Sequence, residues 1–164
     1  ANYPRENNIP TFGICLGMQC MIVEFARNVL GLADANSREM NETTPNNVID
    51  IMEEAKAHLS DTMRMGNFDC ALIDGSKIKS IYGANCIQER HHHRYELNNK
   101  YQEQLETAGM KCVGINPDTK LVEAVEIAEH PWYIGVQYYP QYNSTVLKPH
   151  PLFLSFIKAA IENN

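Results

Sequence analysis

The spacing of apolar residues along the chain predicts which segments are helices. From Leu16 to Leu30 the apolar residues recur at steps of three and four, which places them on one stripe of a helix that Gly31 would end. A second apolar face predicts a final helix over Pro151–Asn163. Shorter helices are predicted at Ala35–Met40, at Ser76–Tyr82 with Ser76 as its N-cap, and at Tyr101–Ala108 before Gly109.

Short apolar runs bounded by turn residues predict strands. The first, Thr11–Ile14, leads directly into the long helix and is expected in the interior of a sheet. An opening strand–helix unit followed by clustered strands indicates an α/β domain with a central, partly parallel sheet. Polar loops are predicted at Asn41–Asn47 and Glu53–Ser60. The other predicted strands are Val48–Met52, Thr62–Met65, Cys70–Ile73, Asn85–Gln88, Met110–Ile115, Leu121–Ile127 and Trp132–Tyr138.

Composition narrows the class of protein. A chain of 164 residues that is 44% hydrophobic and 21% charged is typical of one globular domain, here 1–164 without an internal boundary. The net charge of −6 and the lack of a basic stripe argue against nucleic acid as a partner. No apolar run has membrane-spanning length, and the polar start Ala1–Asn8 has no signal-peptide pattern. Five cysteines, an odd number in apolar surroundings, favour reduced thiols and a cytoplasmic location.

The junction between the first strand and the long helix carries the strongest chemical signal. Gly13-Ile14-Cys15-Leu16-Gly17 is the cysteine form of the nucleophile elbow, G-x-C-x-G. A sharp strand-to-helix turn strains its central residue, and neighbours without a Cβ make room for it. At a helix N-terminus Cys15 is expected to favour the thiolate. The alternative, a buried small hydrophobe at a strand end, is disfavoured by the glycine spacing.

The motif also carries a family resemblance. Gly13–Gln19 resembles the glutaminase motif of class I glutamine amidotransferases, and Glu24–Gly31 with Asp34–Ser37 resembles the CTP synthase branch of that family. The resemblance covers essentially the whole chain and implies a flavodoxin-like sheet flanked by helices. It also implies that the chain begins midway through the glutaminase domain. The first strands, the glycine-rich oxyanion loop and the synthetase domain would then be absent, either because this is a fragment or because another chain supplies them.

The predicted acid/base position departs from the resembled family. That family has a Q-F-H-P-E pattern in which histidine is the base and glutamate orients it, whereas this chain has Gln137-Tyr138-Tyr139-Pro140-Gln141. Tyr139 therefore stands in place of the histidine and Gln141 in place of the glutamate. A phenol titrates near pH ~10, so Tyr139 is protonated at neutral pH and is a poor base. Since a positioned acid/base contributes roughly 10²- to 10⁴-fold, the departure predicts impaired hydrolysis.

The resemblance also implies a set of substrate contacts. Leu16 and Gln19 would touch the glutamine, Glu39 would bind its α-amino group, and Arg94, next to Tyr95, would pair with its α-carboxylate. These residue types suit the task, because arginine clamps a carboxylate with two hydrogen bonds and glutamate pairs with an ammonium. Taken without the resemblance, Glu39 is more simply a solvated helix charge, and Arg94 is uninformative.

Arg64 is a candidate effector contact. Asp61-Thr62-Met63-Arg64-Met65-Gly66 resembles the family's G-T-M-R-L-G, with Asp61 in place of glycine. In CTP synthases this region adjoins the site where GTP activates glutamine hydrolysis. The equally simple alternative is a solvated basic residue on a strand.

The run His91-His92-His93 raises the question of a metal site. Successive residues of a strand point to opposite faces, so three adjacent histidines cannot converge on one ion. The sequence has no second cluster of cysteine or histidine at zinc spacing. No metal is therefore predicted.

The leading hypothesis is the glutaminase portion of a CTP synthase. An intact relative would hydrolyse glutamine and pass ammonia to the synthetase domain of the same protein, which aminates UTP. The resemblance implies no cofactor in this domain, and ATP, Mg and the effector GTP for a full-length enzyme, which would be a homo-oligomer. The alternative is a non-catalytic pseudo-amidotransferase that serves as a binding or assembly module.

Overall fold

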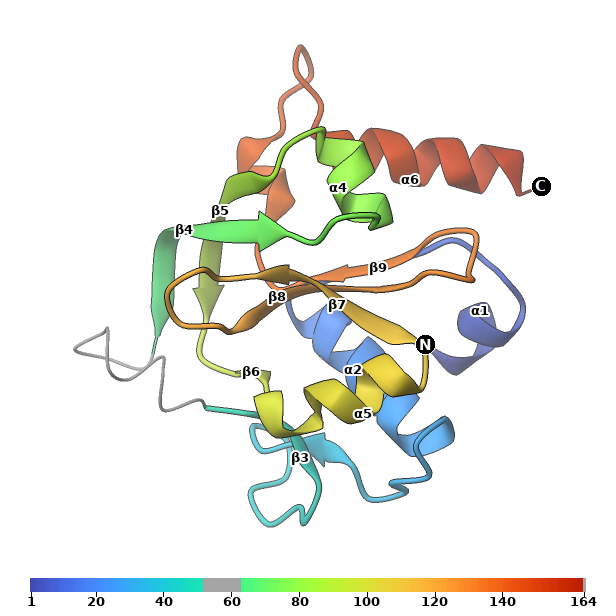
Figure 1. Ribbon diagram of the computed structural model, residues 1–164, viewed down its shortest axis with the longest axis vertical. Helices are drawn as coiled ribbons and strands as arrows, with labels where there is room; N and C mark the ends of the chain where they lie inside the picture. Colours follow the sequence, from blue (N-terminus) through green and yellow to red (C-terminus); the bar gives the residue numbers. More distant parts are fainter. Residues whose placement is uncertain (52–62, 164) are drawn as a thin grey trace.

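A computed structural model describes residues 1–51 and 63–163 of the chain (Figure 1). Its helices are α1 (Asn2–Glu6), α2 (Leu16–Asn28), α4 (Lys77–Tyr82), α5 (Gln102–Thr107) and α6 (Pro151–Glu162), with 3-10 helices η1 (Asn99–Tyr101) and η2 (Pro140–Asn143). Its strands are β1 (Thr11–Ile14), β2 (Asn36–Ser37), β3 (Asn47–Asp50), β4 (Arg64–Leu72), β5 (Cys86–His93), β6 (Glu96–Leu97), β7 (Met110–Ile115), β8 (Val122–Ile127) and β9 (Tyr133–Val136). No described helix is long and apolar enough to cross a membrane.

The main sheet has six strands in the order β1-β9-β8-β7-β4-β5. Among its described strands, β1 and β9 pair in parallel, with Gly13 opposite Gly135, and the other neighbours are antiparallel. A smaller sheet has the order β2-β3-β6. The predicted α/β class with a partly parallel sheet is confirmed. The expectation that Thr11–Ile14 lies inside the sheet is wrong, since β1 ends the strand order and pairs only with β9 among the described strands.

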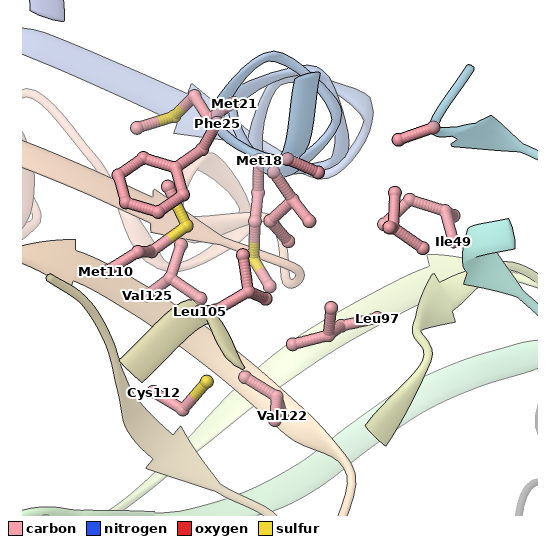
Figure 2. Close-up of a cluster of buried hydrophobic side chains, with 14 of the residues drawn as sticks. Met18, Met21, Phe25, Ile49, Leu97, Leu105, Met110, Cys112, Val122 and Val125 are labelled. Carbon is pink, nitrogen blue, oxygen red and sulfur yellow. The ribbon is translucent and has the colours of Figure 1, made fainter. Parts of the chain in front are cut away.

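Helices cover both faces of the main sheet (Figure 1). On one side α2, α5 and the small sheet enclose an apolar cluster, in which Met18, Met21 and Phe25 of α2 face the sheet (Figure 2). On the other side α4 and α6 pack on a second cluster that includes Trp132 and Leu152. Burial of these two clusters holds the β1–α2 junction in place, because both elements contribute side chains to them.

The long helix forms as predicted but ends at Asn28, and Val29 is exposed rather than part of the buried stripe. The predicted helix over Ala35–Met40 is wrong. Asn36 Oδ1 accepts a hydrogen bond from the Ser37 N–H at 2.9 Å, and Ser37 Oγ accepts one from the Glu39 N–H at 3.2 Å. Such local side-chain bonds compete with helix formation, and Asn36–Ser37 instead pairs with β3.

The strands predicted separately at Thr62–Met65 and Cys70–Ile73 belong to one strand, β4. β4 runs unbroken from Arg64 to Leu72 and pairs with the whole of β5, which extends past the predicted Gln88 to His93. The exposed Asn67 and Asp69 inside β4 alternate with the less exposed Gly66, Phe68 and Cys70, as period two requires. The Ser76 cap is confirmed, because its side chain accepts a hydrogen bond from the Lys79 N–H. The loop predicted at Glu53–Ser60, with Met52 and Thr62, lies outside the described residues.

Candidate functional site

Cys15 lies between the end of β1 and the start of α2, as the elbow motif predicts. Its backbone has φ 50° and ψ −106°, a strained conformation for a residue with a Cβ. The Cys15 N–H donates to the Val136 carbonyl at 2.8 Å, which ties the turn to the neighbouring strand β9. The expectation of unusual backbone angles at this junction is confirmed.

The two elbow glycines differ in their surroundings. A Cβ at Gly13 would collide with the Met21 sulfur and would lie 2.8 Å from the backbone of Gly17 and Met18. Gly13 therefore allows α2 to pack directly against β1. A Cβ at Gly17 would meet nothing within 4 Å, so the steric reason predicted for both glycines holds among the described residues for Gly13 alone.

A cavity of about 390 Å³ opens beside Cys15, within the usual range for small-molecule sites. The structure brings most of the predicted site residues together around it, and leaves Gln141 and Arg64 outside its lining. Met63, His92 and His93, which sequence reasoning did not assign to the pocket, complete its wall. The predicted residues that line it are Cys15, Leu16, Gln19, Glu39, Arg94, Tyr95 and Tyr139.

Two opposite charges border this cavity. Glu39 follows β2 in an exposed turn rather than the predicted helix, and Arg94 is exposed just after β5. Their side chains come from separate elements and line the same pocket as the Cys15 thiol. An ammonium and a carboxylate on one small ligand would match this arrangement.

Burial decides the protonation of Cys15. The side chain is 8% exposed, and this loss of solvent raises the pKa of the Cys15 thiol. Interactions with the Tyr139 phenol, the Leu16 backbone and the Gln137 amide lower the pKa, but less than burial raises it, and Glu39 raises it further. The expectation that the elbow favours a thiolate is therefore wrong for the resting site, because desolvation outweighs the donors around the sulfur.

Tyr139 lies where the resembled family has its base. Its backbone N–H donates to the Arg90 carbonyl at 2.9 Å, and its half-buried phenol lies beside the Cys15 thiol. Burial and the neighbouring thiol both raise the pKa of Tyr139, so the phenol is protonated at neutral pH. Gln141 is exposed on η2, and its side chain makes no hydrogen bond to Tyr139 in the part of the chain that the structure describes.

Gln137 is a site residue that sequence reasoning missed. It follows β9, is fully buried, and its Nε2 donates to the Cys15 sulfur at 3.4 Å. Gln19, predicted as a substrate contact, uses its Nε2 within the protein, while its buried Oε1 has no hydrogen-bond partner among the described residues. A signal for Gln137 was present, because it precedes the base position within the same motif.

Arg64 is buried rather than at the surface, and in β4 it pairs with His93 of the pocket wall. It is 1% exposed and pairs with Glu96 and with Glu123, each at 2.7 Å. The alternative of a solvated basic residue is therefore wrong. Effector contact by Arg64 stays a prediction that this geometry does not support, since a soluble nucleotide cannot reach a guanidinium enclosed by two carboxylates.

His91 and His93 share one face of β5, as alternate residues of a strand must. His91 Nδ1 lies 2.9 Å from His93 Nε2 and 3.5 Å from Glu123 Oε2, so these three residues form a set that could hold a metal. The prediction considered all three histidines of the run and overlooked this pair. Burial and the Arg64 charge lower the pKa of His91 to about 2 and of His93 to about 3. Both imidazoles are therefore neutral at pH 7, and the ion pairs next to them are those of Arg64 with Glu96 and Glu123.

Comparison with known proteins agrees with the geometry. Residues 1–159 match the family model of the class-I glutamine amidotransferases, and the chain belongs to that family. It is also 64% identical to the CTP synthase of Bacteroides thetaiotaomicron over 98% of its length, and 65% identical to that of Bacteroides fragilis over 99%. The chain spans 30% and 31%, respectively, of these two relatives. A solved glutaminase domain of Trypanosoma brucei CTPS with bound acivicin matches with a TM-score of 0.92 at 38% identity, over 98% of this chain and 63% of that one.

Proposed function

We propose that this chain is the glutaminase portion of a CTP synthase and that its hydrolysis of glutamine is impaired. In the whole protein, ammonia from glutamine would pass to a synthetase domain that aminates UTP with ATP and Mg, with GTP as effector. The similarity to two CTP synthases supports the assignment of the branch. The single observation that carries the proposal is one pocket that joins Cys15, Glu39, Arg94 and a phenol at the base position.

The pocket suits an α-amino acid with a side-chain amide. Glu39 would hold the α-ammonium and Arg94 the α-carboxylate, and the amide carbon would then approach Cys15 at the pocket wall. Leu16, 47% exposed at the start of α2, offers apolar contact to the methylene groups. Attack by the sulfur on the amide would form a tetrahedral intermediate, which would release ammonia and leave a thioester for water to cleave.

Each of these steps needs a proton to move, and this site lacks a group to move it. The thiol must lose its proton before attack, yet its pKa is raised by burial. The Tyr139 phenol cannot accept that proton at neutral pH because its own pKa is raised. Loss of a positioned acid/base costs roughly 10²- to 10⁴-fold, so glutamine would bind but turn over slowly.

The proposal is tested by CTP formation in the full-length protein with two nitrogen sources. Free ammonium bypasses Cys15, so ammonium-driven CTP formation should exceed glutamine-driven formation by about 10²-fold or more. Comparable rates with both sources would overturn the impaired hydrolysis. No CTP from either source, with glutamine binding retained, would favour the alternative of a non-catalytic binding module, for which the protonated phenol beside a protonated thiol is the supporting observation.

A further inference from the structure

Two buried glutamines connect the main chain of one pocket wall to the Cys15 sulfur. Gln19 lies in the first turn of α2 and is 3% exposed, and Gln137 is 0% exposed. Gln19 Nε2 donates to the Tyr95 carbonyl at 2.8 Å and to Gln137 Oε1 at 3.2 Å. Gln137 Nε2 then donates to Cys15 Sγ at 3.4 Å. These contacts form one continuous chain, called here the amide relay.

The direction of the amide relay is fixed by its first member. A backbone carbonyl can only accept, so the Gln19 group that faces Tyr95 must be the NH₂. The same NH₂ also faces Gln137, which must therefore present its oxygen to Gln19. Its own NH₂ is then left to face the sulfur of Cys15. Turning Gln137 around would set two NH₂ groups against each other in a buried place, which is costly.

Backbone contacts hold both ends of the relay. The Gln137 N–H donates to the Glu123 carbonyl at 2.8 Å, and the Gln19 N–H donates to the Cys15 carbonyl at 3.2 Å. Glu123 and Glu96 both form ion pairs with Arg64, and Glu96 is the residue after Tyr95. Both side chains are enclosed by the packed core, so each amide stays next to its partners and can only exchange its oxygen and nitrogen by a half-turn.

A donor aimed at sulfur favours the thiolate, which accepts hydrogen bonds strongly, over the thiol. We propose that Gln137 is a thiolate-stabilising residue, that Gln19 is a positioning residue acting through it, and that both raise the reactivity of Cys15 in addition to any effect of residue 139. Burial raises the pKa of Cys15, and the Gln137 amide counteracts part of that rise. This inference goes beyond the proposed function, because it concerns attack on any electrophile and needs neither glutamine nor a base.

The test is the pH profile of Cys15 alkylation by iodoacetamide in the full-length protein. Peptide mass spectrometry distinguishes Cys15 from the exposed Cys20 and Cys86. Gln137→Met keeps the shape but removes the donor, and a hydrogen bond to a charged group is worth about a 10- to 100-fold change in thiolate fraction. Alkylation of Cys15 at pH 8 should slow by that factor and its apparent pKa should rise. Gln104→Met, on the exposed face of α5, is the matched control and should change neither.

A second variant reverses the relay without removing a side chain. In Gln19→Glu the carboxylate can accept from the Gln137 NH₂, so Gln137 would turn its oxygen toward the sulfur and favour the thiol. The apparent pKa of Cys15 should again rise, while protection of the buried Cys70 and Cys112 from alkylation reports an intact fold. An unchanged Cys15 profile in either folded variant would overturn the proposal. Faster alkylation of Cys15 would also overturn it, since the amides would then shield the sulfur rather than stabilise its anion.

Discussion

The two walls of the pocket differ in how closely they follow the resembled family. The wall built by the β1–α2 junction, the turn after β2 and the segment after β5 has the elbow cysteine and the opposite charges of Glu39 and Arg94. The wall built by the segment between β9 and η2 has Tyr139 in place of a base, and Gln141 points to solvent. The charged residues and the phenol therefore come from separate elements, so one set can change without the other.

The physical reason lies in what each side chain does for the fold. Gly13 is needed for close packing of α2, and Cys15 has a strained backbone that tertiary contacts hold. Residue 139, in contrast, is tied to β5 through its backbone N–H, a bond that any side chain except proline permits. A substitution at residue 139 thus costs the fold little, whereas a substitution at Gly13 disturbs it.

The largest expected effect comes from the buried ion pairs of Arg64 with Glu96 and Glu123. Arg64→Met would leave two buried carboxylates, Glu96 and Glu123, without their cation, which costs about 3–5 kcal/mol of unfolding free energy. Urea denaturation measures this loss. Arg38→Met, which breaks the half-exposed pair with Asp50, is the matched control and should cost about 1 kcal/mol or less. Similar losses of unfolding free energy in both variants would contradict the conclusion that Arg64 is needed to neutralise two buried carboxylates.

A smaller effect is expected from the charges at the pocket mouth. Arg94→Gln removes the proposed partner of the α-carboxylate and should weaken glutamine binding by about 10- to 100-fold, the value of a charge-assisted hydrogen bond. Isothermal titration calorimetry of the full-length protein gives the dissociation constant. Arg90→Gln, a substitution of an exposed arginine outside the pocket lining, should leave it unchanged. Equal affinities for glutamine in the two variants would contradict the proposal that Arg94 binds the α-carboxylate.

A further effect is a dependence of stability on pH. The pKa values of His91 and His93, about 2 and about 3, lie below the ordinary 6.5, so the unfolded chain takes up protons first as pH falls. Stability should therefore be complete above about pH 6.5 and decline below it, by up to about 1.4 kcal/mol per pH unit for each histidine. Urea midpoints at pH 7.5 and 5.5 measure the decline. His91→Gln should reduce the slope and the exposed His92→Gln should not; equal slopes in all three proteins would refute the prediction.

Features that depend on regular spacing or on local geometry could be predicted from the sequence. The stripe on α2, the cap at Ser76 and the turn at Cys15 each follow from local geometry. The convergence of His91 with Glu123 could not be predicted, since it depends on how β5 and β8 lie across the sheet. The rise in the pKa of Cys15 also escaped prediction, because a helix N-terminus can be read from sequence whereas desolvation by a packed core cannot. Gln137 could have been proposed from its place in the motif. That its NH₂ group faces the sulfur could not, because this orientation follows from the contact of Gln19 with the Tyr95 carbonyl.

The central claim is that the defect in this site is confined to Tyr139 and Gln141. The most direct test is glutamine-dependent ammonia release by the full-length protein after Tyr139→His with Gln141→Glu, which supplies a base with a pKa near ~6.5 and its orienting carboxylate. We expect a gain of at least about 10²-fold, a smaller gain from Tyr139→His alone, and none from Tyr139→Phe, with ammonium-driven activity unchanged. A protein that already releases ammonia quickly with Tyr139 in place, or one that the double change does not improve, would contradict the account.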